Sequence, residues 1–192
     1  MGGRPAGVAV RRILDTIYAA AMVGACLSMV GIAALVSVQV GGRILDQVLV
    51  LFDSAQLGIA VPSLSEIGGF LLVGAAFLAL PETLRAAGHV RVIFLLNILG
   101  PGPGRLLTVL VLAVALGLAG WATWHAGAQA WDSWAFDSAS FGVVKVPLWI
   151  PQSVMTLGLG LFALALADEL VQSLFGEPAF RRVERGRAGG DY

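Results

Sequence analysis

The residues of this sequence that could do chemistry are few, and the two histidines come first. A b-type haem in a membrane protein usually takes two axial histidines at one depth. His89 precedes the long apolar run that starts after Arg105, and His125 lies near the end of that run. A spanning helix would therefore place the two imidazole rings at opposite membrane surfaces. The two histidines of one subunit could then not bind the same iron. A haem held between two subunits at either surface is the alternative that this spacing leaves open.

Other signatures of catalysis are missing from the sequence. It contains no HExxH, no GxSxG and no phosphate-binding Walker loop. The single cysteine, Cys26, lies within an apolar run and fits a small buried hydrophobe better than a zinc ligand. We therefore expect no catalytic residue, no cofactor and no metal site, and no enzymatic activity.

The composition points to a membrane. Of 192 residues only 12% are charged, against roughly 25% in ordinary soluble domains, while 58% are hydrophobic. So few charges cannot cover a surface that faces water, which excludes a soluble globular protein. The formal net charge is zero, so nothing would neutralise the phosphates of a nucleic acid. The fold class that remains is an all-α integral membrane protein, because the apolar runs are continuous and do not alternate as in a β-barrel.

The positions of the charges divide the chain into spans of about 20 apolar residues, the length that crosses a bilayer. We predict four transmembrane helices, near residues 15–40, 65–87, 105–130 and 147–169. They form a single membrane domain, residues 1–176, followed by a polar, Arg-rich tail, residues 177–192. Two shorter apolar pieces, residues 44–52 and 92–99, are predicted to be interfacial segments. Within the second span, Pro81 should kink the helix or mark its last turn.

The basic residues predict the orientation. Of the 12 Lys and Arg, only Arg43 and Lys145 fall on one side of the predicted spans, and the other ten fall on the opposite side. By the positive-inside rule both termini are cytoplasmic. The five tryptophans, at 121, 124, 131, 134 and 149, gather toward the outer side, in the third helix, the outer loop and the start of the fourth helix. We interpret them as anchors at the outer interface, with an aromatic substrate cage as the alternative.

The span interiors favour packing over transport. The central parts of the first, third and fourth spans carry no ionisable residue, although an ion or substrate path would need one. Small residues are spaced for close helix approach at Gly24 and Ser28 in the first span and at Gly74 in the second. At the start of the second span, Ser65 is predicted to be the N-cap, with Glu66 in the first turn. These features indicate an accessory or scaffold subunit.

Three short motifs, in their order and spacing, resemble a known family. They are Pro62-Ser63-Leu64-Ser65-Glu66, the stretch from Leu84 to Val92 (LRAAGHVRV), and Pro147-Leu148-Trp149-Ile150-Pro151 followed by Gly158. Together with the four spans, they are similar to the DctQ family, the small permease subunit of tripartite ATP-independent periplasmic (TRAP) transporters. The resemblance implies candidate subunit-interface or motif residues at Ser65, Glu66, Arg85, His89, Arg91, Pro147, Trp149, Pro151 and Gly158. The sequence departs from the family pattern at Ile67 and Ile93, which stand where acidic residues are typical.

The resemblance also implies a function. A DctQ-like subunit is a non-catalytic scaffold in the bacterial inner membrane. It supports a large TRAP permease in sodium-coupled symport, in which a periplasmic solute-binding protein delivers an organic acid. The partners implied are that permease, the binding protein and membrane lipids. Two alternatives from other classes are a membrane anchor of a redox complex, which would show a Soret band, and a self-standing exporter, which would transport alone in proteoliposomes.

Overall fold

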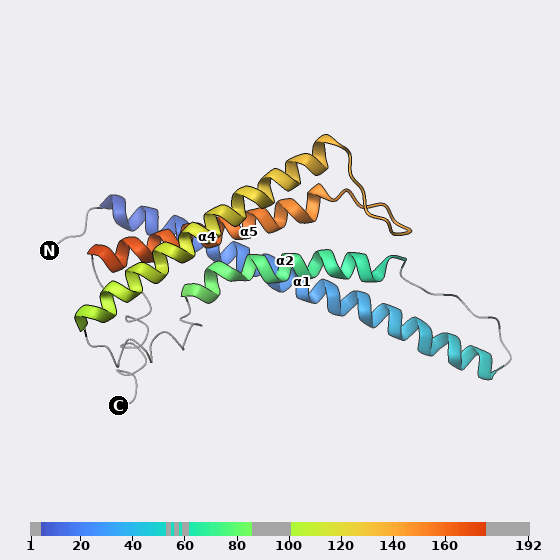
Figure 1. The fold of residues 1–192 in the computed structure, drawn as a ribbon. Helices are drawn as coiled ribbons and strands as arrows, with labels where there is room; N and C mark the ends of the chain where they lie inside the picture. The colour runs from blue at the N-terminus through green and yellow to red at the C-terminus, as the bar shows by residue number, and fades with distance from the viewer. Residues whose placement is uncertain (1–4, 53–54, 56–57, 59–61, 86–100, 176–192) are drawn as a thin grey trace, which may run out of the picture.

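The chain is all-helical in the computed structural model, which describes residues 5–52, 55, 58, 62–85 and 101–175. Four helices follow one another along the chain (Figure 1): α1 (Pro5–Leu51), α2 (Leu64–Arg85), α4 (Pro101–Ala135) and α5 (Trp149–Phe175). All four are long and apolar enough to cross a membrane. This confirms the predicted fold class. Residues 92–99, for which an interfacial segment was predicted, and the tail 177–192 lie outside the described residues.

The first helix is much longer than predicted. α1 has 47 residues and is about 70 Å long at 1.5 Å per residue, more than twice the roughly 30 Å hydrocarbon core. The prediction of a separate interfacial helix at 44–52 was wrong, because α1 continues without interruption to Leu51. Gly41 and Gly42 do not end it, since a helical glycine costs only about 1 kcal/mol, and no proline follows Pro5 until Pro62.

Three further details of the helices differ from the predictions. Pro81 lies inside α2, is buried, and is followed by four more helical residues, so it does not mark the last turn. α4 extends to Ala135, which places Trp131 and Trp134 on the helix and not in the outer loop. Cys26, predicted to be buried, is exposed on α1.

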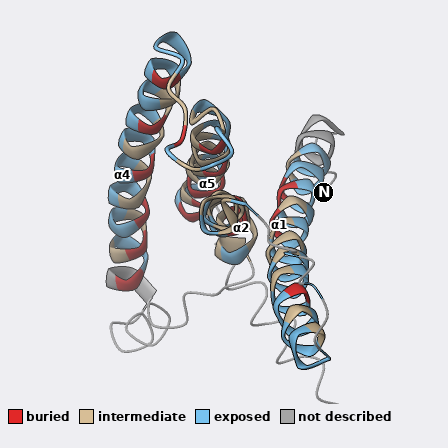
Figure 2. Ribbon diagram, turned by 90° about the vertical axis from the view of Figure 1, so that its right-hand side faces the viewer, coloured by how far each residue is buried: buried red, intermediate tan, exposed pale blue. Residues whose placement is uncertain are grey.

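The helices pack as an open row. α1 packs on α2, α2 on α5, and α5 on α4 (Figure 2). Because each helix has at most two extensive neighbours in this row, only 11–22% of the residues in each apolar span are buried. Most of the large apolar side chains, such as Leu27, Val30 and Leu118, point outward. A small core forms where Leu112 and Ala119 of α4 meet Leu166 of α5.

Glycines allow the central helices to approach one another closely. A Cβ at Gly158 of α5 would lie 2.6 Å from the backbone carbonyl of Phe77 in α2. A Cβ at Gly74 would lie 2.9 Å from the Ser28 hydroxyl oxygen, and one at Gly24 would lie 3.1 Å from Leu78. The predicted packing roles of Gly24, Ser28 and Gly74 are therefore confirmed. At Gly68 and Gly117, by contrast, an added Cβ would meet nothing within 4 Å.

We expect Gly158→Ala to lower the apparent melting temperature of the full chain in mild detergent. The added methyl must push α2 away from α5, and such overpacking costs about 1–3 kcal/mol. Gly160→Ala is the matched control, because its Cβ would meet only the Thr123 methyl at an ordinary 3.7 Å. The measurement is thermal unfolding followed by circular dichroism. Equal melting temperatures for the two variants would contradict the close α2–α5 contact.

Candidate functional site

The start of α2 is capped by Ser63. Its carbonyl oxygen accepts hydrogen bonds from the backbone N–H groups of Glu66 and Ile67, both at 3.0 Å. Its φ of 54° lies in the left-handed region, where the chain turns into the helix. Ser63 thus stands at the N-cap position, and the prediction of Ser65 for that role was wrong, since Ser65 lies in the first turn. Glu66 lies in the first turn as predicted.

The segment between α4 and α5, residues 136–148, is a small ordered hairpin. Ala139 and Pro147 form an isolated antiparallel bridge. Around it, the Ser140 N–H donates to the Val146 carbonyl and the Leu148 N–H donates to the Ser138 carbonyl, both at 2.9 Å. The Ser140 hydroxyl joins the two sides by accepting from the Val146 N–H at 3.1 Å. The tip of this hairpin therefore has a defined backbone shape.

The tip of the hairpin is bonded to the first turn of α2. The Gly142 N–H donates to Glu66 Oε1 at 3.0 Å, and the Val144 N–H donates to the Ser63 hydroxyl oxygen at 3.0 Å. A Cβ at Gly142 would overlap the Glu66 carboxylate and lie 2.6 Å from the Ser63 oxygen. A side chain at position 142 would therefore displace the Glu66 and Ser63 side chains from these contacts. Nothing in the sequence near Gly142 or Ser63 marks this contact, since the partner lies nearly 80 residues away.

The opposite end of α2 is held by Arg85. Its guanidinium lies 2.5 Å from the Asp15 carboxylate of α1 and 5.1 Å from the centre of the Tyr18 ring. Tyr18 is only 1% exposed, and Glu82 lies 3.9 Å from Arg85 on the same helix. The sequence places Arg85 among the basic residues that predict the orientation. In the structure it also joins α2 to α1, and neither Asp15 nor Tyr18 was predicted to take part.

The same side of the row carries two further polar contacts. Arg11 of α1 donates to the Gln172 side chain of α5 at 3.3 Å. Arg105 of α4 donates to the carbonyl oxygens of Ser173 and Leu174 at 3.0 and 2.7 Å. Those carbonyls belong to the last turn of α5, where no backbone donor within the helix is left for them. The basic residues of this side thus connect all four helices.

The remaining motif residues occupy separate places. Pro147 lies in the hairpin bridge, Trp149 opens α5, and Pro151 is buried in its first turn, while Gly158 meets α2 in the middle of the row. His89 and Arg91 lie outside the described residues. Glu66 and Arg85 lie at opposite ends of α2, about 30 Å apart at 1.5 Å per residue. The motif residues therefore do not form one cavity, and instead mark successive contacts along α2 and α5.

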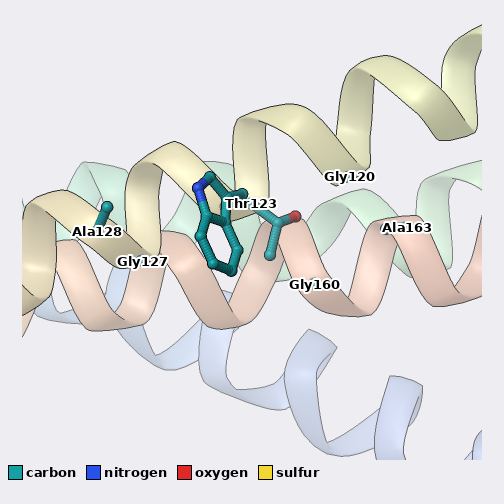
Figure 3. Close-up of a pocket in the computed structure, with 7 residues that line it drawn as sticks. Gly120, Thr123, Gly127, Ala128, Gly160 and Ala163 are labelled. Atoms are coloured by element: carbon teal, nitrogen blue, oxygen red, sulfur yellow. The ribbon is translucent and has the colours of Figure 1, made fainter.

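Two pockets among the described residues are open and apolar. One, of about 490 Å³, lies between α4 and α5 (Figure 3) and is lined by Gly120, Thr123, Trp124, Gly127, Ala128, Gly160 and Ala163. A neighbouring groove has Trp131, Trp134 and Trp149 along it. No carboxylate lines either one, and no group of three His, Cys, Asp or Glu side chains gathers in the described part of the chain. All five tryptophans are more than a third exposed, and whether they serve as interface anchors stays a prediction.

Comparison with known proteins gives one match. The family model described as "Tripartite ATP-independent periplasmic transporters, DctQ component" matches residues 54–176. This region contains α2, α4, α5 and the hairpin, and it leaves out α1. No curated protein and no solved structure matches the chain.

We expect Gly142→Ala and Glu66→Ala to loosen the hairpin tip. Each change breaks the Glu66–Gly142 contact, and a hydrogen bond to a charged acceptor contributes about 1.5–3 kcal/mol, which corresponds to roughly tenfold or more in local opening. Hydrogen exchange at the amides of residues 142–144 measures this. Glu66→Gln should change exchange less, because its side-chain oxygen still accepts from Gly142. Ser65→Ala, on the same turn, is the control, and equal exchange in Glu66→Ala and Ser65→Ala would contradict the contact.

We expect Asp15 and Arg85 to be energetically coupled. Because their side chains are 48% and 29% exposed, solvent screens the pair, and a double-mutant cycle with Asp15→Asn and Arg85→Gln should give a coupling of about 0.5–1 kcal/mol. Thermal unfolding in detergent supplies the four stabilities. Arg85→Lys should recover only part of the loss, since an ammonium lacks the planar stacking of guanidinium on Tyr18. A coupling indistinguishable from zero would show that the contact does not stabilise the α1–α2 pair.

Proposed function

The chain belongs to the DctQ family, the small membrane component of tripartite ATP-independent periplasmic transporters, and from this we propose that it is the non-catalytic scaffold of such a transporter. In this role it supports a large permease that carries the substrate and sodium sites. A periplasmic binding protein delivers the substrate, an organic acid, to the assembly. The chain lies in the bacterial inner membrane with both termini in the cytoplasm.

The observation that carries the scaffold role is the open row of helices. α4 has no ionisable side chain between Arg105 and Asp132 except the exposed His125, which stacks on Trp121 at 4.5 Å. α5 has none from Trp149 to Ala167. The charged contacts described above lie toward the ends of the row, through Arg11, Glu66, Arg85 and Arg105. Long apolar stretches without a charged side chain offer no path for an anion or sodium, which supports placing that path in another subunit.

The exposed apolar faces support contact with a large partner. Apolar side chains are exposed along nearly the whole length of α1, from Ile13 to Leu51. A helix of about 70 Å exceeds one bilayer crossing, so it must tilt strongly or project beyond the hydrocarbon core. A large permease beside the row would cover such a surface. The chain's own helices do not cover it.

The basic residues support the orientation. Arg11, Arg85 and Arg105, which belong to the predicted cytoplasmic set, all lie at the end of the row where α2 and α5 finish. The hairpin and the start of α2 lie at the other end. The row therefore has one end rich in arginine, as the positive-inside rule requires of a cytoplasmic face.

The test is co-purification combined with uptake. The tagged full chain, extracted from native membranes in mild detergent, should bring down a larger hydrophobic permease. Deletion of the chain should abolish sodium-dependent uptake of labelled organic acids, and the intact gene should restore it. Gly160→Ala serves as a variant expected to behave as the unmodified chain. Recovery of a lone monomer, with uptake unimpaired after deletion, would refute the scaffold role.

A further inference from the structure

The hairpin at residues 136–148 exposes apolar side chains to an unusual degree. Phe136 is 80% exposed, Phe141 is fully exposed and Val143 is 86% exposed. These side chains lie outside the four helices, so the need to span a bilayer does not account for them. Such exposure is unfavourable in water, because removing a large apolar side chain from water lowers the free energy by about 1.5–3 kcal/mol.

The depth of the hairpin is fixed at three points. Its base follows Ala135, the last residue of α4, and precedes Trp149, the first residue of α5. Its tip is bonded through Gly142 and Val144 to the first turn of α2. All three points are ends of apolar spans on one side of the row, and Figure 1 shows the hairpin reaching from α4 and α5 toward the start of α2. The hairpin therefore runs along the boundary where the spans end.

The backbone of the hairpin suits that boundary. The polar groups of its two sides pair with each other, through Ser140 with Val146 and through Leu148 with Ser138. The Gly142 and Val144 N–H groups are taken up by Glu66 and Ser63. Internal pairing of this kind lowers the cost of bringing a loop out of bulk water.

We propose that the hairpin is an interfacial anchor that inserts Phe136, Phe141 and Val143 into the headgroup and upper acyl region of the outer leaflet. Exposed Lys145 lies next to these side chains in the chain and can meet lipid phosphate. Trp134, in the last turn of α4, and Trp149, at the start of α5, carry the aromatic surface on to the base of the hairpin. The proposal rests on the membrane location and the orientation proposed above, and does not depend on the proposed partners.

The anchor would give Glu66 a specific purpose. At this end of the row, the hairpin and the α2–α5 contact hold α4 and α5 against α2. Glu66 and Ser63 bond the hairpin to α2. Lipid contact at the hairpin tip and helix contact at Gly158 would therefore both help to position α2, α4 and α5. Glu66 is then a positioning residue for the anchor and has no contact with substrate.

Site-directed spin labelling tests the anchor in the full chain. On a Cys26→Ser background, nitroxide labels are placed at Phe141→Cys, at Val143→Cys and, as the control on the same hairpin, at Lys145→Cys. The chain is reconstituted in phosphatidylethanolamine–phosphatidylglycerol vesicles, alone and together with its permease. Collisions with oxygen, which concentrates in lipid, and with a water-soluble nickel chelate report the environment of each label.

We expect the oxygen-to-nickel accessibility ratio to be several-fold higher at positions 141 and 143 than at 145, with or without the permease. Ratios at 141 and 143 as low as at 145 would place the tip in water and overturn the proposal. Labels shielded from both reagents once the permease or the binding protein is added would show a protein partner at the tip, which also overturns it. Two labelled positions keep the test decisive if one variant fails to fold.

Discussion

The structure depends on how little helices gain from packing against one another in lipid. Lipid tails are as apolar as Leu and Val side chains, so burial alone does not hold transmembrane helices together. What remains is close contact between backbones and polar bonds between helices. In this chain both are found on the two middle helices, α5 and α2. The clearest case is α2. It meets α5 at Gly158, meets α1 at Gly74 and Ser28, and is bonded at its two ends through Glu66 and Arg85.

This arrangement explains the open shape. A helix that holds neighbours on two sides builds a row, whereas a bundle needs each helix to have contacts around a shared centre. The row leaves wide apolar faces, which cost nothing against lipid and can be covered by a larger subunit. The central turns of α4 and α5 also carry no charged side chain, which fits a supporting component of a transporter better than a conducting one.

The two ends of α2 differ in chemistry because they face different surroundings. At the end rich in arginine, charged side chains connect all four helices through Asp15, Gln172 and the last carbonyls of α5. At the other end, a single carboxylate and a serine hydroxyl bind the backbone of the hairpin. Backbone N–H groups at a hairpin tip suit this carboxylate, because charged acceptors make the stronger hydrogen bonds.

The sequence alone determined the class of this protein, its number of membrane helices and its family. The scarcity and spacing of charges identified a membrane protein with four helices, because the free energy of placing a charge in hydrocarbon dominates any local preference. The family also followed from short motifs, since their order survives in the linear chain. The helix ends did not follow, and α1 ran through Gly41 and Gly42 because two glycines are too weak a signal to stop an apolar helix.

The contacts at each end of α2 were decided only by the tertiary structure. Nothing near Glu66 in the chain indicates Gly142, and nothing near Arg85 indicates Asp15, 70 residues earlier. Composition and the spacing of charges indicate whether a segment lies in water or in lipid, because the free energy of transfer between the two is a property of each side chain. Which segments meet is set by close packing of particular surfaces, such as Gly158 on Phe77, and that information is absent from any single stretch of the chain.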